Sequence, residues 1–353
     1  MGGAEPRAGQ YAGEPGGRLF RRVSVGEAVC EGAVGLAGSY VKAFLYIRRR
    51  MSLLIIANPV SGKGVFEKLR PEIEVHLRQR NVEFEIWSWD KVEEMDEMMA
   101  RAQAMGFQKI IAAGGDGTVH HVGKRLIGTD VLFGVMPIGT GNGIANHFHI
   151  PKRVRSCLDV YLEPATVRMD TGLMNDEPFL GFVGIGGYDA YTAHRFAGIK
   201  KRSFTGYIKI ALDSYQAVAP QTYKVTVHPP EGAPYTYTDR HTAFSSLNVS
   251  QFGNGMTPAP GERVDDGVFS LCTLVHAPAW YIPVFSFKMF TRTIGEGDRY
   301  GKRKRAVKVI LEREAESIAQ IDGEPAYAPA KVEIKLRPQS LTFMVPPGVK
   351  DRV

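Results

Sequence analysis

The sequence predicts a mixed α/β protein, with an N-terminal α/β domain built on a parallel sheet and a C-terminal antiparallel β-sandwich domain. Before residue 150, short apolar runs alternate with amphipathic helical segments, which is typical of strands buried on both faces of a parallel sheet. After Pro151, segments rich in β-branched and aromatic residues follow one another between Gly, Pro and Asp turns, which favours antiparallel pairing. A length of 353 residues suits two domains, which we place at 51–150 and 151–345.

Residues 1–50 differ in composition from the rest of the chain. As far as Arg18 the sequence is rich in Gly, Ala, Pro and Glu and has no apolar period, which indicates disorder. Met51 directly precedes the first convincing strand. We therefore expect residues 1–50 to be a disordered or non-native extension that the fold does not need.

The N-terminal domain is expected to alternate strands and helices. The expected strands are Ser52–Ala57, Val82–Trp89, Ile110–Ala113 and Val131–Pro137, and the expected helices are Phe66–Gln79, Val92–Met105 and a short one at Ile144–Phe148. Because the carboxyl ends of parallel strands meet at one edge of a sheet, the turns that follow these strands should lie together.

The stretch Ile110–Val122 (IIAAGGDGTVHHV) carries the strongest chemical signal in this domain. Its glycines let main-chain N–H groups approach a ligand closely, and the turn leads into a helix N-terminus, which favours phosphate. Asp116 would repel phosphate unless a divalent cation or a reacting hydroxyl lies between them, as phosphoryl transfer requires. The structural alternative is a plain strand–turn–helix corner with Asp116 as the helix cap.

Two other turns offer similar chemistry. Asn58–Gly64 (NPVSGKG) follows the first strand, but it lacks the first glycine and the Lys-Ser/Thr ending of a Walker loop, which argues against a P-loop nucleoside triphosphatase. Its Asn58, Ser61 and main-chain N–H groups could still hold a nucleotide. Ile138–Gly143 (IGTGNG) follows the fourth strand and supplies a hydroxyl and an amide.

Histidines and cysteines give no metal signature. Neither the pair His120 and His121 nor the pair His147 and His149 has an acid or a cysteine at ligand spacing, so we interpret them as structural or surface residues. The three cysteines, Cys30, Cys157 and Cys272, are odd in number and far apart, which excludes a disulfide framework and favours a reducing cytosol.

The C-terminal domain is expected to consist mostly of strands. They are expected at Arg168–Thr171, Glu177–Gly184, Tyr223–His228, Ala243–Ser250, Val268–Val275, Arg305–Leu311, Ser317–Ile321 and Lys331–Leu336, with helices at Thr205–Val218 and within Ala279–Ile294. The second helix is aromatic and apolar, and we favour core packing over a lipid-facing surface because apolar stripes usually point inward. Ile321–Pro325 (IDGEP) places two acids around a glycine in a hairpin turn, which needs no function on its own.

The formal net charge of +7 implies anionic partners: nucleic acid, anionic lipid or a phosphorylated substrate. The excess is concentrated in basic runs at 48–50, 200–202 and 302–305. No apolar run approaches the roughly 18 residues that a membrane-spanning helix needs, so any membrane contact is expected to be peripheral.

Six motifs, taken together and in order, resemble those of the diacylglycerol kinase catalytic-domain family, which includes soluble bacterial lipid kinases and, more distantly, sphingosine and ceramide kinases. They are Asn58–Gly62, Gly114–Thr118, Gly139–Asn142, Gly184–Ala190 (GIGGYDA), Asn248–Gly267 (NVSQFGNGMTPAPGERVDDG) and Asp322–Glu324. Each alone is a weak signal, but the ordered set is highly specific and extends from Leu53 to Val345. The resemblance implies an α/β nucleotide domain, a C-terminal β-sandwich and an active site in the cleft between them.

The resemblance also implies roles for individual residues. The positions that match ATP-binding residues are Asn58, Pro59, Ser61, Gly62, Ser88, Gly114, Gly115, Asp116, Gly117, Thr118, Val119, His120, Gly139, Thr140 and Asn142. Asp322 matches the general base, and Glu324 matches its companion beside Mg²⁺, to which Asp116 would be linked through water.

Three further positions are implied by the resemblance. Asp266, with the main-chain oxygens of Arg263 and Val268, matches a second, structural Mg²⁺ site of some bacterial members. Asp189 matches the acid with which sphingosine kinases bind a lipid head group. Gly143 stands where many bacterial diacylglycerol kinases have an Asp of the Mg²⁺ network, and a small residue there is similar to the sphingosine kinase version.

We therefore expect an ATP- and Mg²⁺-dependent lipid kinase that phosphorylates the hydroxyl of a diacylglycerol-like or sphingoid-like lipid. It is expected to be cytoplasmic, to associate peripherally with the membrane, to act in lipid metabolism and to bind no nucleic acid, and its sheet edges would allow a homodimer. Asp116→Ala or Asp322→Asn is expected to abolish transfer and leave the fold intact.

Two alternatives stay open at this point. An NAD kinase shares the GGDGT turn and the two-domain plan, although Asp322–Glu324 and the NVSQFGN segment are more similar to lipid kinases. A non-catalytic binder of membranes or nucleic acid would use the basic runs and would leave the acids at Asp116, Asp322 and Glu324 unexplained. The lipid and the oligomeric state also stay open.

Overall fold

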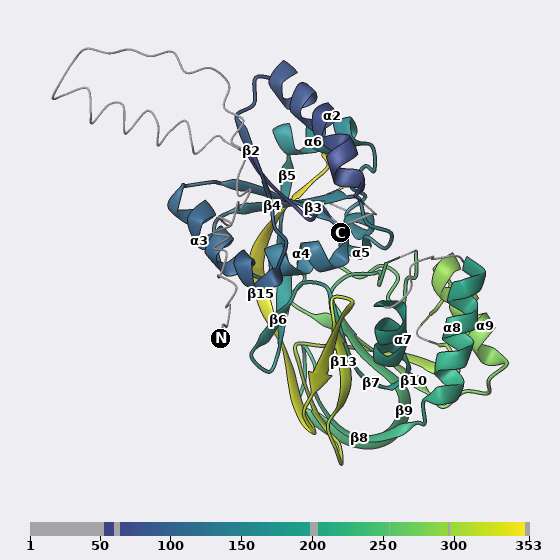
Figure 1. Ribbon diagram of the computed structural model, residues 1–353. Helices are drawn as coiled ribbons and strands as arrows, with labels where there is room; N and C mark the ends of the chain where they lie inside the picture. Colours follow the sequence, from purple (N-terminus) through teal and green to yellow (C-terminus); the bar gives the residue numbers. More distant parts are fainter. Residues whose placement is uncertain (1–52, 60–63, 198–203, 254, 296, 350–353) are drawn as a thin grey trace, which may run out of the picture.

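The structure is a computed structural model that describes residues 53–349 apart from 60–63, 198–203, 254 and 296 (Figure 1). Residues 1–50, the basic runs at 48–50 and 200–202, and the predicted nucleotide residues Ser61 and Gly62 lie outside the described residues. The predicted fold class is confirmed, because the strands are parallel in the N-terminal part and antiparallel in the C-terminal part.

The N-terminal part alternates strands and helices as the apolar pattern predicts. Its elements are β1 (Leu53–Ala57), α2 (Val65–Gln79), β2 (Phe84–Ser88), η2 (Val92–Glu94), α3 (Met95–Ala104), β3 (Lys109–Gly114), α4 (Asp116–Gly123), β4 (Leu132–Pro137), α5 (Gly143–His147) and α6 (Val154–Leu162). The four strands lie in the parallel order β4-β3-β1-β2. Every residue of β1 is buried, since β1 lies between two strands and is covered on both faces.

The C-terminal part is mostly antiparallel, and its helices lie outside the curved strands (Figure 1). Its elements are β5 (Ala165–Met174), β6 (Glu177–Phe179), β7 (Phe182–Gly186), α7 (Gly187–Ala197), α8 (Phe204–Ala217), β8 (Gln221–His228), β9 (Tyr235–Leu247), β10 (Phe269–Val275), α9 (Tyr281–Thr291), β11 (Gly301–Ala306), β12 (Lys308–Glu312), β13 (Ser317–Ile321), β14 (Glu324–Ala328) and β15 (Lys331–Val345). The strands curve around a second core that contains Phe179, Tyr223, Phe244 and Phe269.

The long strand β15 joins the two parts. It pairs with β12 and β5, and its Phe343 lies beside Phe133 of β4, so the described strands form one hydrogen-bonded sheet. Phe343 also packs on Phe148, with ring centroids 4.3 Å apart. The hydrophobic core around the parallel strands continues past residue 150 into α6, through Cys157 and Leu158. The domain boundary at 150 stays a prediction.

Among the described residues, no helix is both long and apolar enough to cross a bilayer.

Candidate functional site

Two glycine turns at the carboxyl ends of β3 and β4 pack backbone against backbone. The Gly114 carbonyl oxygen accepts hydrogen bonds from the N–H groups of Ile138 and Gly139, both at 3.2 Å. A Cβ on Gly139 would overlap the Gly115 Cα, so only glycine fits without a backbone shift. The sheet therefore brings the GGDGT and GTGN turns together, as the sequence predicts.

The Asp116 carboxylate links these two turns. Its oxygens accept hydrogen bonds from the N–H groups of Asn142 (2.8 Å) and Gly143 (2.6 Å), at the beginning of α5. Asp116 is itself the first residue of α4, so its carboxylate interacts with the start of a different helix from the one it begins. A Cβ on Gly141 would overlap the Asp116 carboxylate. The glycine therefore allows the turn to lie close to this acid.

Gly143 lies against the segment that follows β9. A Cβ on Gly143 would lie 3.1 Å from the Gly253 nitrogen and 3.2 Å from the Gln251 oxygen. Main chain therefore occupies the space next to Gly143, and a larger side chain would have to displace it.

The Asp322 carboxylate is held by main chain and by one histidine. Asp322 is 2% exposed, and its oxygens accept hydrogen bonds from the N–H groups of Leu180 (2.8 Å), Gly181 (2.7 Å) and Phe182 (3.0 Å). Its Oδ2 also lies 2.9 Å from Nδ1 of the buried His120, in α4. This hydrogen bond spans 202 positions of sequence and connects the GGDGT helix to the IDGEP hairpin.

Glu324 lies against the first glycine turn. A Cβ on Gly117 would overlap Glu324 Oε1, so the carboxylate occupies the space that the missing side chain leaves. The sequence predicts that the acidic turns at Asp116 and Asp322–Glu324 face one another, and these contacts agree with that prediction.

The other predicted nucleotide residues lie around the same edge of the sheet. Asn58 and Ser88 are at the ends of neighbouring strands, where Arg70 of α2 donates a hydrogen bond to the Ser88 hydroxyl at 3.3 Å. Pro59 follows Asn58 in a turn, and Thr118 and Val119 are buried in α4. Their roles remain predictions.

A cavity of about 590 Å³ opens beside the GTGN turn. It is lined by Thr140, Gly141, Asn146, His149, Ile150, Lys152, Gln251, Gly255 and Arg292. Lys152 and Arg292 come from distant parts of the sequence and give this cavity a positive lining, which suits an anionic ligand.

Asp189, in the first turn of α7, packs against β7 and β9. The Ser245 hydroxyl donates a hydrogen bond to its Oδ2 at 2.5 Å, whereas its buried Oδ1 has no hydrogen-bond partner among the described residues. Burial raises the pKa of Asp189 to about 7.

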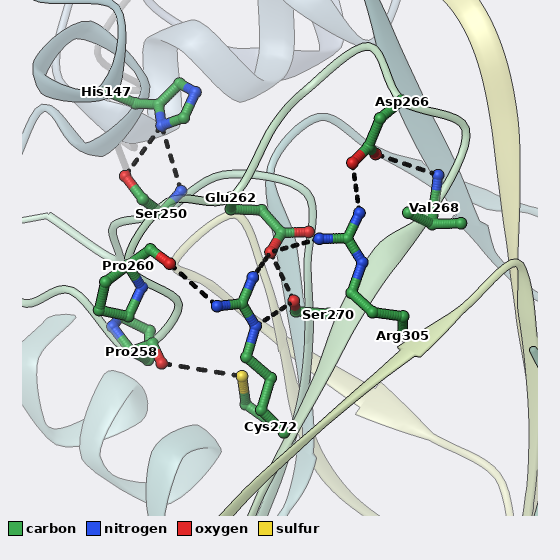
Figure 2. Close-up of polar contacts among 11 residues, drawn as sticks. His147, Ser250, Pro258, Pro260, Glu262, Asp266, Val268, Ser270, Cys272 and Arg305 are labelled. Atoms are coloured by element: carbon green, nitrogen blue, oxygen red, sulfur yellow. Dashed lines mark hydrogen bonds and ion pairs between the residues drawn. The ribbon is translucent and has the colours of Figure 1, made fainter. Parts of the chain in front are cut away.

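The residues of the predicted structural Mg²⁺ site do not fit a cation. Arg305 pairs with Asp266 Oδ2, and the Val268 N–H donates to Asp266 Oδ1 at 3.3 Å (Figure 2). The same guanidinium lies 3.8 Å from the buried Glu262 carboxylate. An arginine therefore neutralises the acid that was predicted to bind metal, and no cluster of three or more His, Cys, Asp or Glu in the described residues could hold an ion.

His147 joins the N-terminal part to the segment after β9. The Ser250 N–H donates to its Nδ1 at 3.2 Å, and the Ser250 hydroxyl lies 2.9 Å from the same atom (Figure 2). Burial lowers the pKa of His147 to about 4, so the ring is neutral near pH 7 and Nδ1 can act as the acceptor.

Sequence reasoning missed three contributors to the site. His120 was predicted only to contact ATP, whereas it binds Asp322, and Lys152 and Arg292 were not predicted to line a cavity. The position of His120 directly after the GGDGT motif could have indicated that it belongs to the site. No local pattern marks the two cations, because the fold alone brings them together.

Comparison with known proteins finds one family to which this chain is similar. Residues 52–174 match the family model described as the diacylglycerol kinase catalytic domain. A diacylglycerol kinase of Staphylococcus saprophyticus is 32% identical over 134 residues, which are 37% of this chain and 44% of that protein. A diacylglycerol kinase of Staphylococcus aureus strain JH9 is 27% identical over 219 residues, 62% of this chain and 68% of that protein. The match thus spans less than half of the first relative and about two thirds of the second.

Solved structures show the same fold. A diacylglycerol kinase structure from Bacillus anthracis strain Sterne has a TM-score of 0.64 at 18% identity and covers 85% of this chain and 98% of that chain. A second structure from the same strain has a TM-score of 0.67 at 21% identity, with the same coverage. The family model and the relatives confirm the resemblance predicted from the six motifs, and residues 52–174 are similar to the diacylglycerol kinase catalytic domain.

Proposed function

We propose that this protein is an ATP-dependent lipid kinase that transfers the γ-phosphoryl group to a lipid hydroxyl beside its two acidic turns. The observation that carries the proposal is the contact between these turns. His120 lies 2.9 Å from Asp322, and Glu324 lies against Gly117, so glycine-rich main chain and two acids share one site. Phosphoryl transfer depends mainly on positioning and on stabilisation of charge, which such a site offers.

The triphosphate would lie along the glycine turns. Their main-chain N–H groups and the start of α4 favour phosphate. Asn58 and Ser88 would bind the rest of the nucleotide at the same edge. The cavity of about 590 Å³ has the size of a small-molecule site, and Lys152 and Arg292 would attract the reacting phosphates.

The acids fit a Mg²⁺ ion that arrives with the nucleotide. Mg²⁺ usually binds one or two carboxylates together with substrate phosphates and water, not an all-protein cage. Glu324 is half-buried and makes no side-chain hydrogen bond to the described residues, so its carboxylate is available to bind a metal ion. It lies against Gly117, the residue that follows Asp116, so the two acids are close together. When bound, Mg²⁺ would neutralise charge on the β- and γ-phosphates.

The Asp322–His120 pair would take the proton of the lipid hydroxyl. Three of the four hydrogen bonds to Asp322 come from main-chain N–H groups, which fix the carboxylate in place. The fourth partner is the His120 ring, and imidazole is the side chain that enzymes use most often as a general base. We therefore assign the base to the pair and not to Asp322 alone.

Asp189 would contact the polar head of the lipid, as in the resemblance to sphingosine kinases. Its unpartnered Oδ1 supports this assignment, because a buried acceptor without a donor is costly unless a ligand supplies one. A protonated Asp189 would donate to a hydroxyl, and an ionised one would pair with an amine.

The test is a labelled-ATP assay with Mg²⁺ against diacylglycerol, ceramide, sphingosine and total lipid extract, with products identified by mass. We expect one phosphorylated lipid. Phosphorylation of NAD and of no lipid would favour the NAD kinase alternative, and ATP turnover with neither product would refute both.

A further inference from the structure

Helix α9 carries apolar side chains on two faces, one buried and the other exposed to solvent. Tyr281, Ile282, Phe285 and Met289 are buried in a small core against α8 and β9. On the other face, Val284 is 40% exposed and Phe287 is 66% exposed, and Trp280, immediately before the helix, is 67% exposed. Spacings of four and three residues place these three side chains in one stripe. The helix is therefore packed as predicted on one side only.

This stripe is unusual for the molecule. The described residues contain six large hydrophobic side chains that are exposed, and three of them, Trp280, Val284 and Phe287, belong to this stripe. Single exposed apolar residues are ordinary, but a contiguous group indicates an interaction surface. In Figure 1, α9 lies beside α8 at the outer side of the C-terminal part.

The helix is held firmly in this position. The Asp298 side chain, 1% exposed, accepts hydrogen bonds from the Tyr281 hydroxyl (2.5 Å), the Lys288 ammonium (2.7 Å) and the Gly301 N–H (2.9 Å). These contacts fasten α9 to the start of β11, so the exposed stripe is a fixed part of the surface.

Charge and position indicate what covers the stripe. Arg292 ends the helix and Arg299 follows it, and both are exposed and make no ion pair with the described residues. Trp and Phe beside arginines match the chemistry of a bilayer interface with anionic head groups. A stable protein interface needs about 800 Å² per partner, which three side chains do not supply.

The stripe also adjoins the proposed active site. Arg292, one turn beyond Phe287, lines the cavity beside the GTGN turn. A bilayer against α9 would therefore lie at the mouth of that cavity. We propose that α9 is the membrane-docking surface of this protein, with Trp280, Val284 and Phe287 inserted among lipid carbonyls and with Arg299 on lipid phosphates, while Arg292 stays at the mouth of the cavity. This proposal rests on the proposed function, because membrane docking would bring a lipid kinase to its substrate.

Trp280 makes the proposal directly testable. The chain has three tryptophans, and Trp87 and Trp89 are only 2% and 7% exposed, so a change of emission on adding vesicles reports mainly on Trp280. We expect a blue shift with vesicles of phosphatidylcholine and phosphatidylglycerol, quenching by brominated acyl chains and protection from iodide. Trp280→Phe should abolish the shift but retain binding in a sedimentation assay.

Substitutions separate insertion from general attraction. The double variant Trp280→Ser and Phe287→Ser should lower vesicle affinity by roughly tenfold or more, because each ring loses its burial in lipid. Val75→Ser, at an apolar side chain of α2 that is 46% exposed, is the matched control and should bind like the wild type. Unchanged Trp280 emission, or equal binding by the double variant, would overturn the proposal. A dimer that the double variant disrupts, without vesicle binding, would replace it with self-association.

The outcome is separable from the kinase proposal. The double variant should phosphorylate a short-chain, water-soluble lipid at the wild-type rate and lose activity only on vesicles. Vesicle insertion without any lipid phosphorylation would leave the docking surface in place and refute the proposed function. Phosphorylation of vesicle lipid at the wild-type rate by the double variant would refute the docking surface alone.

Discussion

The Asp322 carboxylate accepts hydrogen bonds that stabilise the fold, and it is also part of the proposed general base. Its backbone φ of 51° is in the left-handed region, which the following Gly323, at 90°, continues through the hairpin turn. Three N–H groups from 180–182 end on its carboxylate, so the acid fixes the start of β7. The sequence identified the acid but not this role, because its donors lie about 140 positions away.

Replacing Asp322 should therefore affect the fold, contrary to the expectation from sequence. In Asp322→Asn, the amide NH₂ would face main-chain donors, and an unmatched buried donor costs about 1–3 kcal/mol. We expect a lower urea midpoint together with the loss of lipid phosphorylation. The exposed Asp130→Asn is the control and should leave both unchanged. A wild-type urea midpoint in Asp322→Asn would contradict a structural role for Asp322.

Asp189 predicts a pH dependence of stability. Burial raises its pKa from 3.8 to about 7, so in this interval the unfolded chain is ionised while the folded chain retains the proton. The free energy of unfolding should fall as pH rises from about 4 to about 7 and level off above, with a slope of up to about 1.4 kcal/mol per pH unit from this group.

Asp189→Asn should remove that slope, since the amide does not titrate. Urea unfolding at several pH values, compared between wild type and variant, isolates this residue because the other titrations are common to both. The variant should be relatively more stable at pH 8 than at pH 5. Parallel curves would contradict a buried, neutral Asp189.

Elements were predictable where the pattern was strong and local. The strands β1, β2, β3 and β4 agree with their apolar runs to within a few residues. Helix α7 was not predicted because it begins at Gly187, a residue typical of turns, with φ of 68°. A strand was expected at Lys331–Leu336. In the structure β15 continues to Val345, because the register shifts between Arg337 and Leu341, around Gln339 at φ 46°, and pairing with β5 then resumes.

The loop from Asn248 to Gly267 shows a limit of motif reasoning at this scale. Its motif was predicted to carry a structural Mg²⁺, but β11 brings Arg303 and Arg305 beside Glu262 and Asp266. Nothing in the motif itself reveals those arginines, which are about 40 residues away.

We expect the thermal stability of the free protein to be independent of Mg²⁺. The unfolding temperature should be the same in EDTA and in excess Mg²⁺, and Arg305→Met should lower it by several degrees because Asp266 loses its ion pair and the buried Glu262 loses one of its two neighbouring arginines. The exposed Arg153→Met is the matched control. Stabilisation of the wild type by Mg²⁺ that Asp266→Asn abolishes would indicate a metal site there after all.

At the scale of the whole molecule, the site exists only because two distant stretches meet. The shared strand β15 and the His120–Asp322 hydrogen bond hold the N-terminal glycine turns against the IDGEP hairpin. The resemblance to diacylglycerol kinases implied this meeting, whereas the acidic hairpin alone did not. The partner of each acid, and the cavity beside them, follow from tertiary packing and could not be predicted.

Glu324→Gln tests the central claim most directly. The substitution keeps the shape and removes only the charge of a side chain that makes no hydrogen bond to the described residues, so the urea midpoint should not change. The kcat/KM for phosphorylation of a lipid by Mg²⁺-ATP should fall by roughly a hundredfold or more, as expected when a group that stabilises transition-state charge is lost. The exposed Glu314→Gln should retain wild-type activity. Activity of Glu324→Gln within about twofold of the wild type would contradict a phosphoryl-transfer site at the meeting of these two turns.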